Sequence, residues 1–192
     1  FIISKEIKTF FYYIRCGIIF KTEGAHTACR QASLHITGGM DMNIIVIGGV
    51  AAGTKAAAKL KRQDRSAQVK ILTKGTDISY AGCGLPYYVS GMIPGREGLI
   101  VNTPEAYTGL TGAQVVTDCE VTGVDFAAKT VTALRGGAVY TEPYDKLVIA
   151  TGAAPFVPDV PGTDLPGVFT LRTPDDAIGL KAYVADNACR TA

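Results

Sequence analysis

Ile44–Ile47 is a run of four apolar residues that leads directly into the glycine-rich segment Gly48–Gly53. A short, continuous apolar run is typical of a parallel strand that is covered on both faces. Ala51–Arg62 is rich in alanine and ends in basic residues, which favours a helix, and Val69–Thr73 repeats the strand pattern. Strand, glycine turn, helix and strand within about 30 residues predict a right-handed βαβ unit. The expected fold class is therefore α/β, with a Rossmann-like parallel sheet.

The later part of the sequence predicts a second, antiparallel sheet. Between residues 113 and 142, strand-like runs alternate with turns, and Asp125–Lys129 and Arg135–Gly137 have the composition of hairpin turns. Residues 79–92 predict a cysteine loop and a short helix, and another helix is expected from about Pro174. The expected strands are Ala113–Thr117, Glu120–Asp125, Thr130–Leu134 and Ala138–Tyr140, which predict a small β-meander, and then Lys146–Ala150.

The glycine-rich turn predicts a nucleotide site. Gly48 permits a tight turn, and the small residues at 51–53 let a diphosphate approach the amino end of the helix while the helix packs on the sheet. Backbone N–H groups and the helix dipole would then stabilise the diphosphate charge. Val50 replaces the second glycine of a G-x-G-x-x-G motif. A purely structural turn is therefore the alternative.

One expected feature of a dinucleotide site is missing from the sequence. An acidic residue about twenty positions after the turn ordinarily binds the ribose hydroxyls. Thr73 and Lys74 occupy that position instead. Because a threonine hydroxyl binds a ribose hydroxyl less strongly than a carboxylate does, weaker binding of the adenosine half is expected.

Cys83 lies between Gly82 and Gly84, where the backbone could approach something large and flat. Pro86 suits the first turn of a helix that follows. A helix dipole favours the thiolate of a cysteine that precedes it, so Cys83 is a candidate nucleophile and redox centre; an inert, buried cysteine is the alternative. Positions 78 and 88, five residues away, hold no second cysteine. Cys83 would therefore cycle through a sulfenic acid, a persulfide or a mixed disulfide with a small thiol.

Composition and charge exclude several classes of function. Nineteen basic and seventeen acidic side chains leave a net charge of +2, which gives no reason to expect nucleic acid or a membrane as a partner. Phe10–Phe20 is interrupted by Arg15 and is too short to span a bilayer. The five cysteines, at 16, 29, 83, 119 and 189, have neither metal-ligand spacing nor the pattern of a disulfide framework. A reducing, cytoplasmic compartment and no metal site are expected.

Three segments together resemble one enzyme family. They are Gly48–Gly53, the cysteine loop Ser79–Tyr88, and Tyr144–Pro155. In this order and spacing they are similar to the single-cysteine branch of the pyridine nucleotide–disulfide oxidoreductases. That branch includes coenzyme A–disulfide reductases, NADH oxidases, NADH peroxidases and NAD(P)H polysulfide or persulfide reductases. The resemblance covers residues 42–192.

The resemblance implies a flavoprotein in which electrons pass from NAD(P)H through FAD to Cys83. Cys83 would reduce a small disulfide or persulfide such as coenzyme A disulfide. Ser79 and Cys83 would face the flavin ring, Thr73 and Lys74 would lie at the adenosine ribose, and the Val121 backbone would meet the adenine. The other residues expected at FAD are Gly48, Val50, Ala51, Ala52 and Gly53 at the pyrophosphate, and Ala150, Thr151 and Gly152 beside the flavin.

Within the family, the sequence favours the disulfide and persulfide reductases. Oxidases and peroxidases typically carry a histidine at the position of Ala51. Arg62 matches a position that binds coenzyme A phosphate in the reductase subgroup, and with Ser79 it would contact the substrate; a solvated helix end is the alternative for Arg62. Two other functions stay open: an NADH oxidase or peroxidase that uses a cysteine sulfenic acid, and a nucleotide-binding module without catalysis.

The expected organisation is part of a larger enzyme. Residues 1–41 would be a variable or disordered extension and residues 42–155 the first segment of the FAD-binding domain. Residues 156–192 would be a linker and helix leading to an NAD(P)H domain that this sequence lacks. The fragment alone is expected to be inactive. The full-length protein is expected to be a homodimer that acts on a small-molecule thiol or disulfide.

Overall fold

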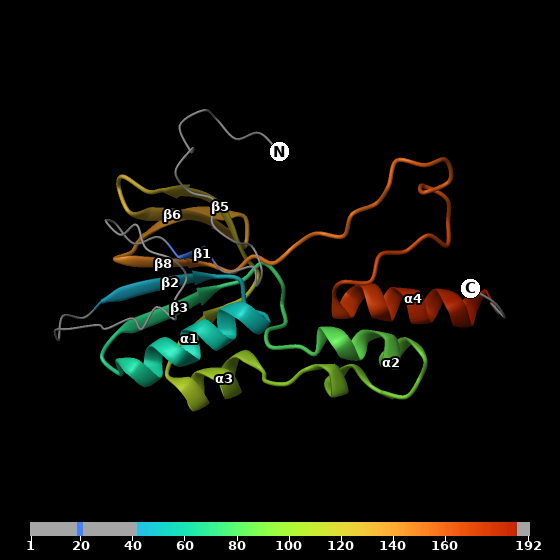
Figure 1. The fold of residues 1–192 in the computed structure, drawn as a ribbon, viewed down its shortest axis with the longest axis horizontal. Coiled ribbons are helices and arrows are strands. Elements are labelled where there is room, and N and C mark those ends of the chain that lie inside the picture. Colours follow the sequence, from blue (N-terminus) through green and yellow to red (C-terminus); the bar gives the residue numbers. More distant parts are fainter. Residues whose placement is uncertain (1–18, 21–41, 188–192) are drawn as a thin grey trace, which may run out of the picture.

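The computed structural model describes residues 19–20 and 42–187, which form a layered main body and a smaller helical lobe (Figure 1). Apart from the short strand β1 (Ile19–Phe20), the predicted extension at residues 1–41 lies outside the described residues. Cys16, Cys29 and Cys189 lie outside them as well. The next described strand after β1 is β2, which contains the apolar run of the sequence.

A parallel sheet forms the centre of the main body. Its order is β1-β8-β2-β3-β4, and β1 pairs antiparallel with the outer edge of β8. β2 pairs parallel with β3, with Ile45 opposite Lys70, which confirms the predicted βαβ unit. The parallel strands are β2 (Asn43–Ile47), β3 (Gln68–Leu72), β4 (Gln114–Val116) and β8 (Lys146–Ile149).

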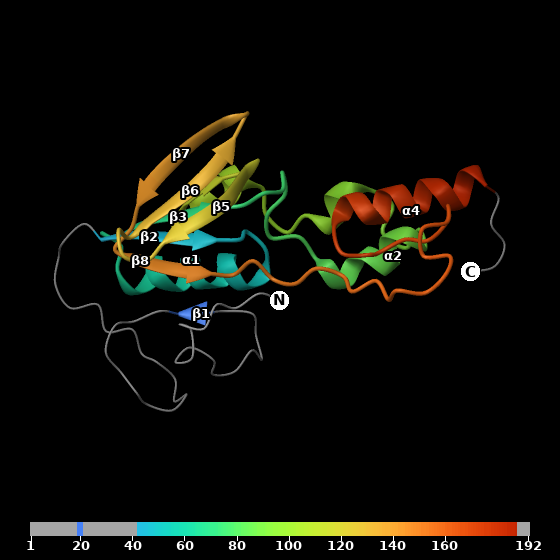
Figure 2. The same ribbon diagram turned by 90° about the horizontal axis from the view of Figure 1, so that it is seen from above.

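Helices cover one face of this sheet and the meander covers the other. Ile44 and Val46 share a core cluster with residues of α1 (Ala51–Gln63), whereas Ile45 and Ile47 share a second cluster with the meander. Figure 2 shows α1 and the meander on opposite sides of the sheet. Because successive residues of β2 are buried on both faces, its sequence is continuously apolar rather than alternating.

The first of the strands predicted between 113 and 142 belongs to the parallel sheet, not to the meander. This strand is β4, and it pairs parallel with β3. A parallel pair needs a long crossover, and part of that crossover is α3 (Pro104–Thr111), a helix that the sequence analysis did not predict. Thr103 caps α3, and Gly112 ends it at φ +76°. Tyr107 is the only described side chain that α3 buries, so the helix lacks a clear apolar period.

The meander confirms the other three predicted strands and both hairpins. Its order is β5-β6-β7. At the first turn, an Asp125 carboxylate oxygen accepts bonds from the N–H groups of Ala127 and Ala128, both 2.9 Å long. At the second turn, Gly136 and Gly137 both have positive φ, as a two-residue hairpin requires. The strands are β5 (Cys119–Asp125), β6 (Thr130–Arg135) and β7 (Ala138–Pro143).

The helical lobe lies beyond the carboxyl ends of the parallel strands (Figure 2). It consists of α2 (Leu85–Val89), the short 3-10 helix η2 (Arg96–Leu99) and α4 (Pro174–Asp186), packed around a small apolar cluster. α4 begins at the predicted Pro174, where Thr173 and Asp176 form a capping box.

Candidate functional site

The candidate site lies at the carboxyl edge of the parallel sheet, where β2, β3 and β8 end beside one another. Gly48 leaves β2 at φ +108°, and its N–H donates to the carbonyl oxygen of Leu72 at 2.8 Å. A Cβ on Gly48 would overlap the carbonyl oxygen of the buried Ala150. The tight turn predicted at Gly48 is therefore present, and only glycine fits it.

The amino end of α1 has the properties of an anion site. Its N-cap residue, Val50, makes no side-chain capping bond, and its first turn contains no acidic residue. The first N–H groups of a helix have no partner within the helix, so here they are available to a diphosphate. Ala51 is exposed and Ala52 is half-buried. The backbone at this turn thus fits the diphosphate of FAD.

Gly53 has a different role from its neighbours. It is buried, and a Cβ at this position would overlap the carbonyl oxygen of Gly48. Gly53 therefore allows α1 to pack against the end of β2. It shapes the turn rather than presenting a surface to a ligand.

Thr73, the residue after β3, lies against the glycine turn. A Cβ on Gly49 would come within 3.0 Å of the Thr73 Cβ. The backbone of Thr73 is fixed on both sides, because its N–H donates to Val116 and its carbonyl accepts from Cys119, each at 3.0 Å. The predicted ribose position is therefore next to the predicted pyrophosphate position.

Lys74 is exposed and forms an ion pair with Glu120, with 2.9 Å between Nζ and Oε1. Val121 follows Glu120 and begins an irregularity in the β5–β6 register. The structure thus brings together Thr73, Lys74 and Val121, the residues predicted for the adenosine half. It adds Glu120, which the sequence analysis missed because 46 positions separate it from Lys74.

A network of hydrogen bonds fixes the cysteine loop to the glycine turn. Ser79 donates its N–H to the carbonyl oxygen of Gly49 at 2.9 Å and accepts from the N–H of Val101 at 3.0 Å. Asn102, which the sequence analysis did not identify, donates to the Ser79 hydroxyl at 3.4 Å. Ser79 has φ +50°, a conformation uncommon for serine. The predicted flavin-facing serine is therefore held rigidly beside the turn.

Cys83 lies in the 3-10 helix η1 (Gly82–Gly84), directly before α2, with an exposed free thiol. A Cβ on Gly82 would meet open space. Gly84, in contrast, is buried, and a Cβ there would lie 3.2 Å from the side chain of Leu99. Only Gly82 leaves room for a flat ligand, whereas Gly84 serves the packing of the lobe.

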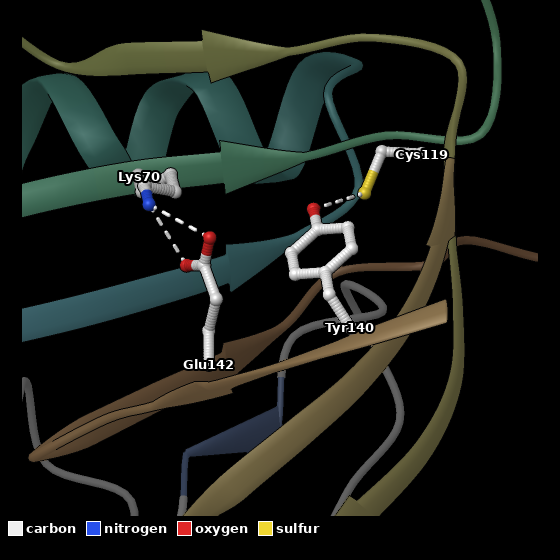
Figure 3. Close-up of polar contacts among 4 residues, drawn as sticks. All are labelled: Lys70, Cys119, Tyr140 and Glu142. Atoms are coloured by element: carbon white, nitrogen blue, oxygen red, sulfur yellow. Dashed lines mark hydrogen bonds and ion pairs between the residues drawn. The ribbon is translucent and has the colours of Figure 1, made fainter. Parts of the chain in front are cut away.

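Cys119 has the opposite environment. It is 1% exposed, and its sulfur lies 3.0 Å from the Tyr140 hydroxyl (Figure 3). Burial, followed by the hydrogen bond to Cys119, raises the pKa of Tyr140 to about 12. Lys70 and Glu142 form an ion pair in the same region, 2.8 Å long. The Lys70–Glu142 pair joins the meander to the parallel sheet, whereas Cys119 and Tyr140 lie on two strands of the meander. Because Cys119 is buried in the cluster between the two sheets, it is a core residue.

The segment after β8 adds a cation to the site. Thr151 and Gly152 are exposed, and Gly152 has φ +73°. The Arg172 Nε donates to the carbonyl oxygen of Ala153 at 3.1 Å, and its Nη2 lies 2.7 Å from where a Gly152 Cβ would be. The charge of Arg172 also acts on Tyr80. Burial raises the pKa of Tyr80, and the positive charge of Arg172 opposes part of this shift. Arg172, missed from the sequence, therefore lies between the β8 exit and the cysteine loop.

Arg62 lies near the carboxyl end of α1, about 16 Å along the helix from Ala51. It is exposed and forms no ion pair with any described residue. The structure does not bring Arg62 to the glycine turn. A substrate that reached both Arg62 and Cys83 would have to be extended.

Other features of the described residues lie away from this edge. A cavity of about 200 Å³ between the parallel sheet and β7 is lined by residues of β2, β3 and β4, including Lys70, and by Glu142 and Pro143 of β7. Among residues 42–187, no group of histidine, cysteine and acidic side chains could hold a metal ion. No helix in the described part of the chain is long and apolar enough to cross a membrane.

Comparisons with known proteins point to one family. The family model described as pyridine nucleotide-disulphide oxidoreductase matches residues 42–188. An NADH oxidase of Methanocaldococcus jannaschii is 33% identical over 78% of this chain and 34% of its own length. A CoA-dependent NAD(P)H sulfur oxidoreductase of Pyrococcus abyssi is 38% identical over 75% of this chain and 32% of its own. The solved structure of reduced Bacillus anthracis CoADR-RHD matches with a TM-score of 0.75 and 35% identity, covering 78% of this chain and 27% of that one. The chain spans about a third of the length of these curated relatives.

Proposed function

Because the chain belongs to the pyridine nucleotide-disulphide oxidoreductase family, we propose that it forms the FAD-binding half of a site whose redox centre is Cys83. This is a family of oxidoreductases that use FAD with NAD(P)H. The observation that carries the proposal is the hydrogen bond from the Ser79 N–H to the Gly49 carbonyl. It joins the cysteine loop to the glycine turn at one edge of the sheet, where α/β folds bind nucleotides.

FAD would extend along this edge. The N–H groups at residues 50–52 would bind its diphosphate, and its adenosine would lie toward Thr73 and Val121. The flavin would lie toward Ser79 and the exposed Gly152, with the Arg172 guanidinium close by. When bound, FAD supplies a ring that accepts a hydride from NAD(P)H and passes on two electrons.

Cys83 would act as the nucleophile toward a small disulfide. Its thiolate attacks one sulfur atom, a Cys83–substrate disulfide bond forms, the original sulfur–sulfur bond breaks, and a thiolate leaves. Two electrons then reduce the mixed disulfide to restore the Cys83 thiolate and release the second thiol. The exposed position of Cys83 supports this role. Coenzyme A disulfide is the substrate we favour, with Arg62 and Ser79 as contacts, because one relative is named as CoA-dependent.

A direct test of this chemistry needs no cofactor. The reduced chain is incubated with coenzyme A disulfide and analysed by intact mass and peptide mapping. Of the two cysteines in the described residues, we expect a coenzyme A adduct at Cys83, because its thiol is exposed, and none at Cys119, because that residue is 1% exposed. The variant Cys83→Ser should lose the adduct. Preferential modification of Cys119, or a Cys83 that reacts with iodoacetamide but not with coenzyme A disulfide, would contradict the proposal.

A second candidate function is reduction of oxygen or peroxide through a sulfenic acid on Cys83. It is favoured by the relative from Methanocaldococcus jannaschii, which is named an NADH oxidase. Alanine at position 51, where oxidases of this family typically have histidine, counts against it. Treatment with hydrogen peroxide and a sulfenic acid trap distinguishes the two. Trapping at Cys83 that is much faster than the reaction with coenzyme A disulfide would favour the oxidase.

The remaining expectations concern the whole protein. We propose that residues 42–155 are the first segment of an FAD domain and that residues 156–192 lead toward a nicotinamide-binding domain. The proposal of a further domain is supported by the length of the curated relatives, of which the chain spans about a third. We further propose that the complete protein is a homodimer. We also propose a reducing, cytoplasmic location, because both described cysteines are free thiols.

A further inference from the structure

The end of β3 lacks the carboxylate that a nucleotide site of this kind uses. In a Rossmann-type unit, an acidic side chain at the end of the second strand accepts hydrogen bonds from the adenosine ribose. Here Thr73 occupies that position, with its Cβ region packed against Gly49. Thr73 is 7% exposed, so little of it is accessible to a ribose.

The fold brings a carboxylate to the same place from another strand. The Cys119 N–H donates to the Thr73 carbonyl at 3.0 Å, and the Asp118 N–H donates to the Gly75 carbonyl at 3.4 Å. The start of β5 therefore runs past the end of β3. Glu120 follows directly, and its Oε1 accepts from the Lys74 ammonium at 2.9 Å.

Glu120 retains the capacity to bind a diol. A carboxylate has two oxygens and about four acceptor sites. Lys74 binds Oε1, and Oε2 makes no hydrogen bond to any described residue. The Glu120 side chain is 45% exposed, so a ligand can reach it. Lys74 pairs with one oxygen of the carboxylate and leaves the other accessible to ribose hydroxyls.

Another ion pair, between Lys70 and Glu142, already links β3 to the meander in a purely structural role. Lys70 and Glu142 also join β3 to the meander, and both Glu142 oxygens accept from Lys70, at 2.9 and 2.8 Å (Figure 3). This pair is less exposed than the Lys74–Glu120 pair, at 31% and 23% against 76% and 45%. It lies four residues, about 13 Å, further back along β3, away from the glycine turn. The chain therefore offers a matched control.

We propose that Glu120 is the specificity-determining residue for the adenosine half of the nucleotide, supplying from β5 the ribose-binding carboxylate that β3 lacks. The inference rests on the proposed function, because it assumes that the glycine turn binds the diphosphate of FAD. It identifies the ligand class as an adenosine nucleotide with a free ribose diol. Val121, the residue expected to meet the adenine, is its immediate neighbour.

The test compares FAD with FMN, which lacks the adenosine. Fluorescence anisotropy of each flavin is measured against increasing concentrations of the 192-residue chain and of the variants Glu120→Gln and Glu142→Gln. Loss of a charged hydrogen bond to the ribose should weaken FAD binding about tenfold in Glu120→Gln. FMN binding should be unchanged, and Glu142→Gln should bind both flavins like the unmodified chain.

The outcomes separate this inference from the proposed function. If the unmodified chain does not bind FAD, the nucleotide site itself is wrong and the role of Glu120 falls with it. If FAD binds equally well to the chain and to Glu120→Gln, the nucleotide site stands and only the role of Glu120 is overturned. Equal losses of FAD affinity in Glu120→Gln and Glu142→Gln would also overturn it, because they would show a general effect on the packing of the meander.

Discussion

Tyr140 shows how packing changes the chemistry of a single side chain. Burial and the hydrogen bond to Cys119 raise its pKa to about 12. An unfolded tyrosine ionises near pH 10, so between about pH 10 and 12 the unfolded chain releases a proton that the folded chain keeps. The stabilisation from the neutral hydroxyl is therefore complete below about pH 10 and is lost as the pH rises through about 12.

This difference predicts an alkaline loss of stability that depends on Tyr140. The free energy of unfolding, measured by urea denaturation from pH 9 to 12, should fall less steeply in Tyr140→Phe than in the unmodified chain. Tyr87, which is 53% exposed, provides the control, and Tyr87→Phe should follow the unmodified chain. Identical pH profiles for Tyr140→Phe and the unmodified chain would show that the Tyr140 hydroxyl does not govern this loss.

The junction of β2 and α1 depends on a glycine that a sequence motif alone does not explain. The buried Gly53 touches the Gly48 carbonyl region, and a Cβ would overlap it and also approach Val46 at 3.2 Å. We expect Gly53→Ala to lower the free energy of unfolding by about 1–3 kcal/mol, the usual cost of overpacking. Urea denaturation followed by circular dichroism measures this.

Gly109 in α3 is the matched control, because it is also a helical glycine but no atom would contact its Cβ. Gly109→Ala should raise the free energy of unfolding by about 0.5–1 kcal/mol, since alanine loses less backbone entropy than glycine. Equal effects of the two substitutions would mean that the contact between α1 and β2 does not require glycine.

At the scale of the whole molecule, the segment between the main body and the helical lobe is notably apolar. Seven large apolar side chains between residues 156 and 171 are 39–89% exposed. Apolar patches of this kind usually mark a surface that contacts something else. The most exposed of them, Phe156, therefore contributes little to the stability of the chain as described.

Phe156, at 89% exposed, allows this to be measured. Phe156→Ser should change the free energy of unfolding by less than about 0.5 kcal/mol, because the ring loses no packing. It should also reduce binding of the hydrophobic dye ANS. Leu85→Ala, at a residue 2% exposed in the lobe, should instead cost about 2–5 kcal/mol. A cost of that size at Phe156 would mean that the segment is packed.

The sequence alone predicted most of the features that depend on neighbouring residues. The apolar run at Ile44–Ile47, the turn at Gly48 and the start of α4 at Pro174 are all local signals, and each has the predicted structure. α3 was missed because its caps are present but its apolar period is weak. The assignments of Cys83 and the FAD-binding residues remain predictions, and the structure shows that most of them share one edge of the sheet.

Only the tertiary structure decided which distant residues meet. Glu120 pairs with Lys74, and Arg172 reaches Ala153, across 46 and 19 positions of sequence. The same packing distinguished the exposed Cys83 from the buried Cys119. The pattern of apolar and polar side chains along a segment reflects how that segment is buried, because each residue has its own degree of burial. Pairing between segments depends on the order and register of strands, which no local pattern specifies.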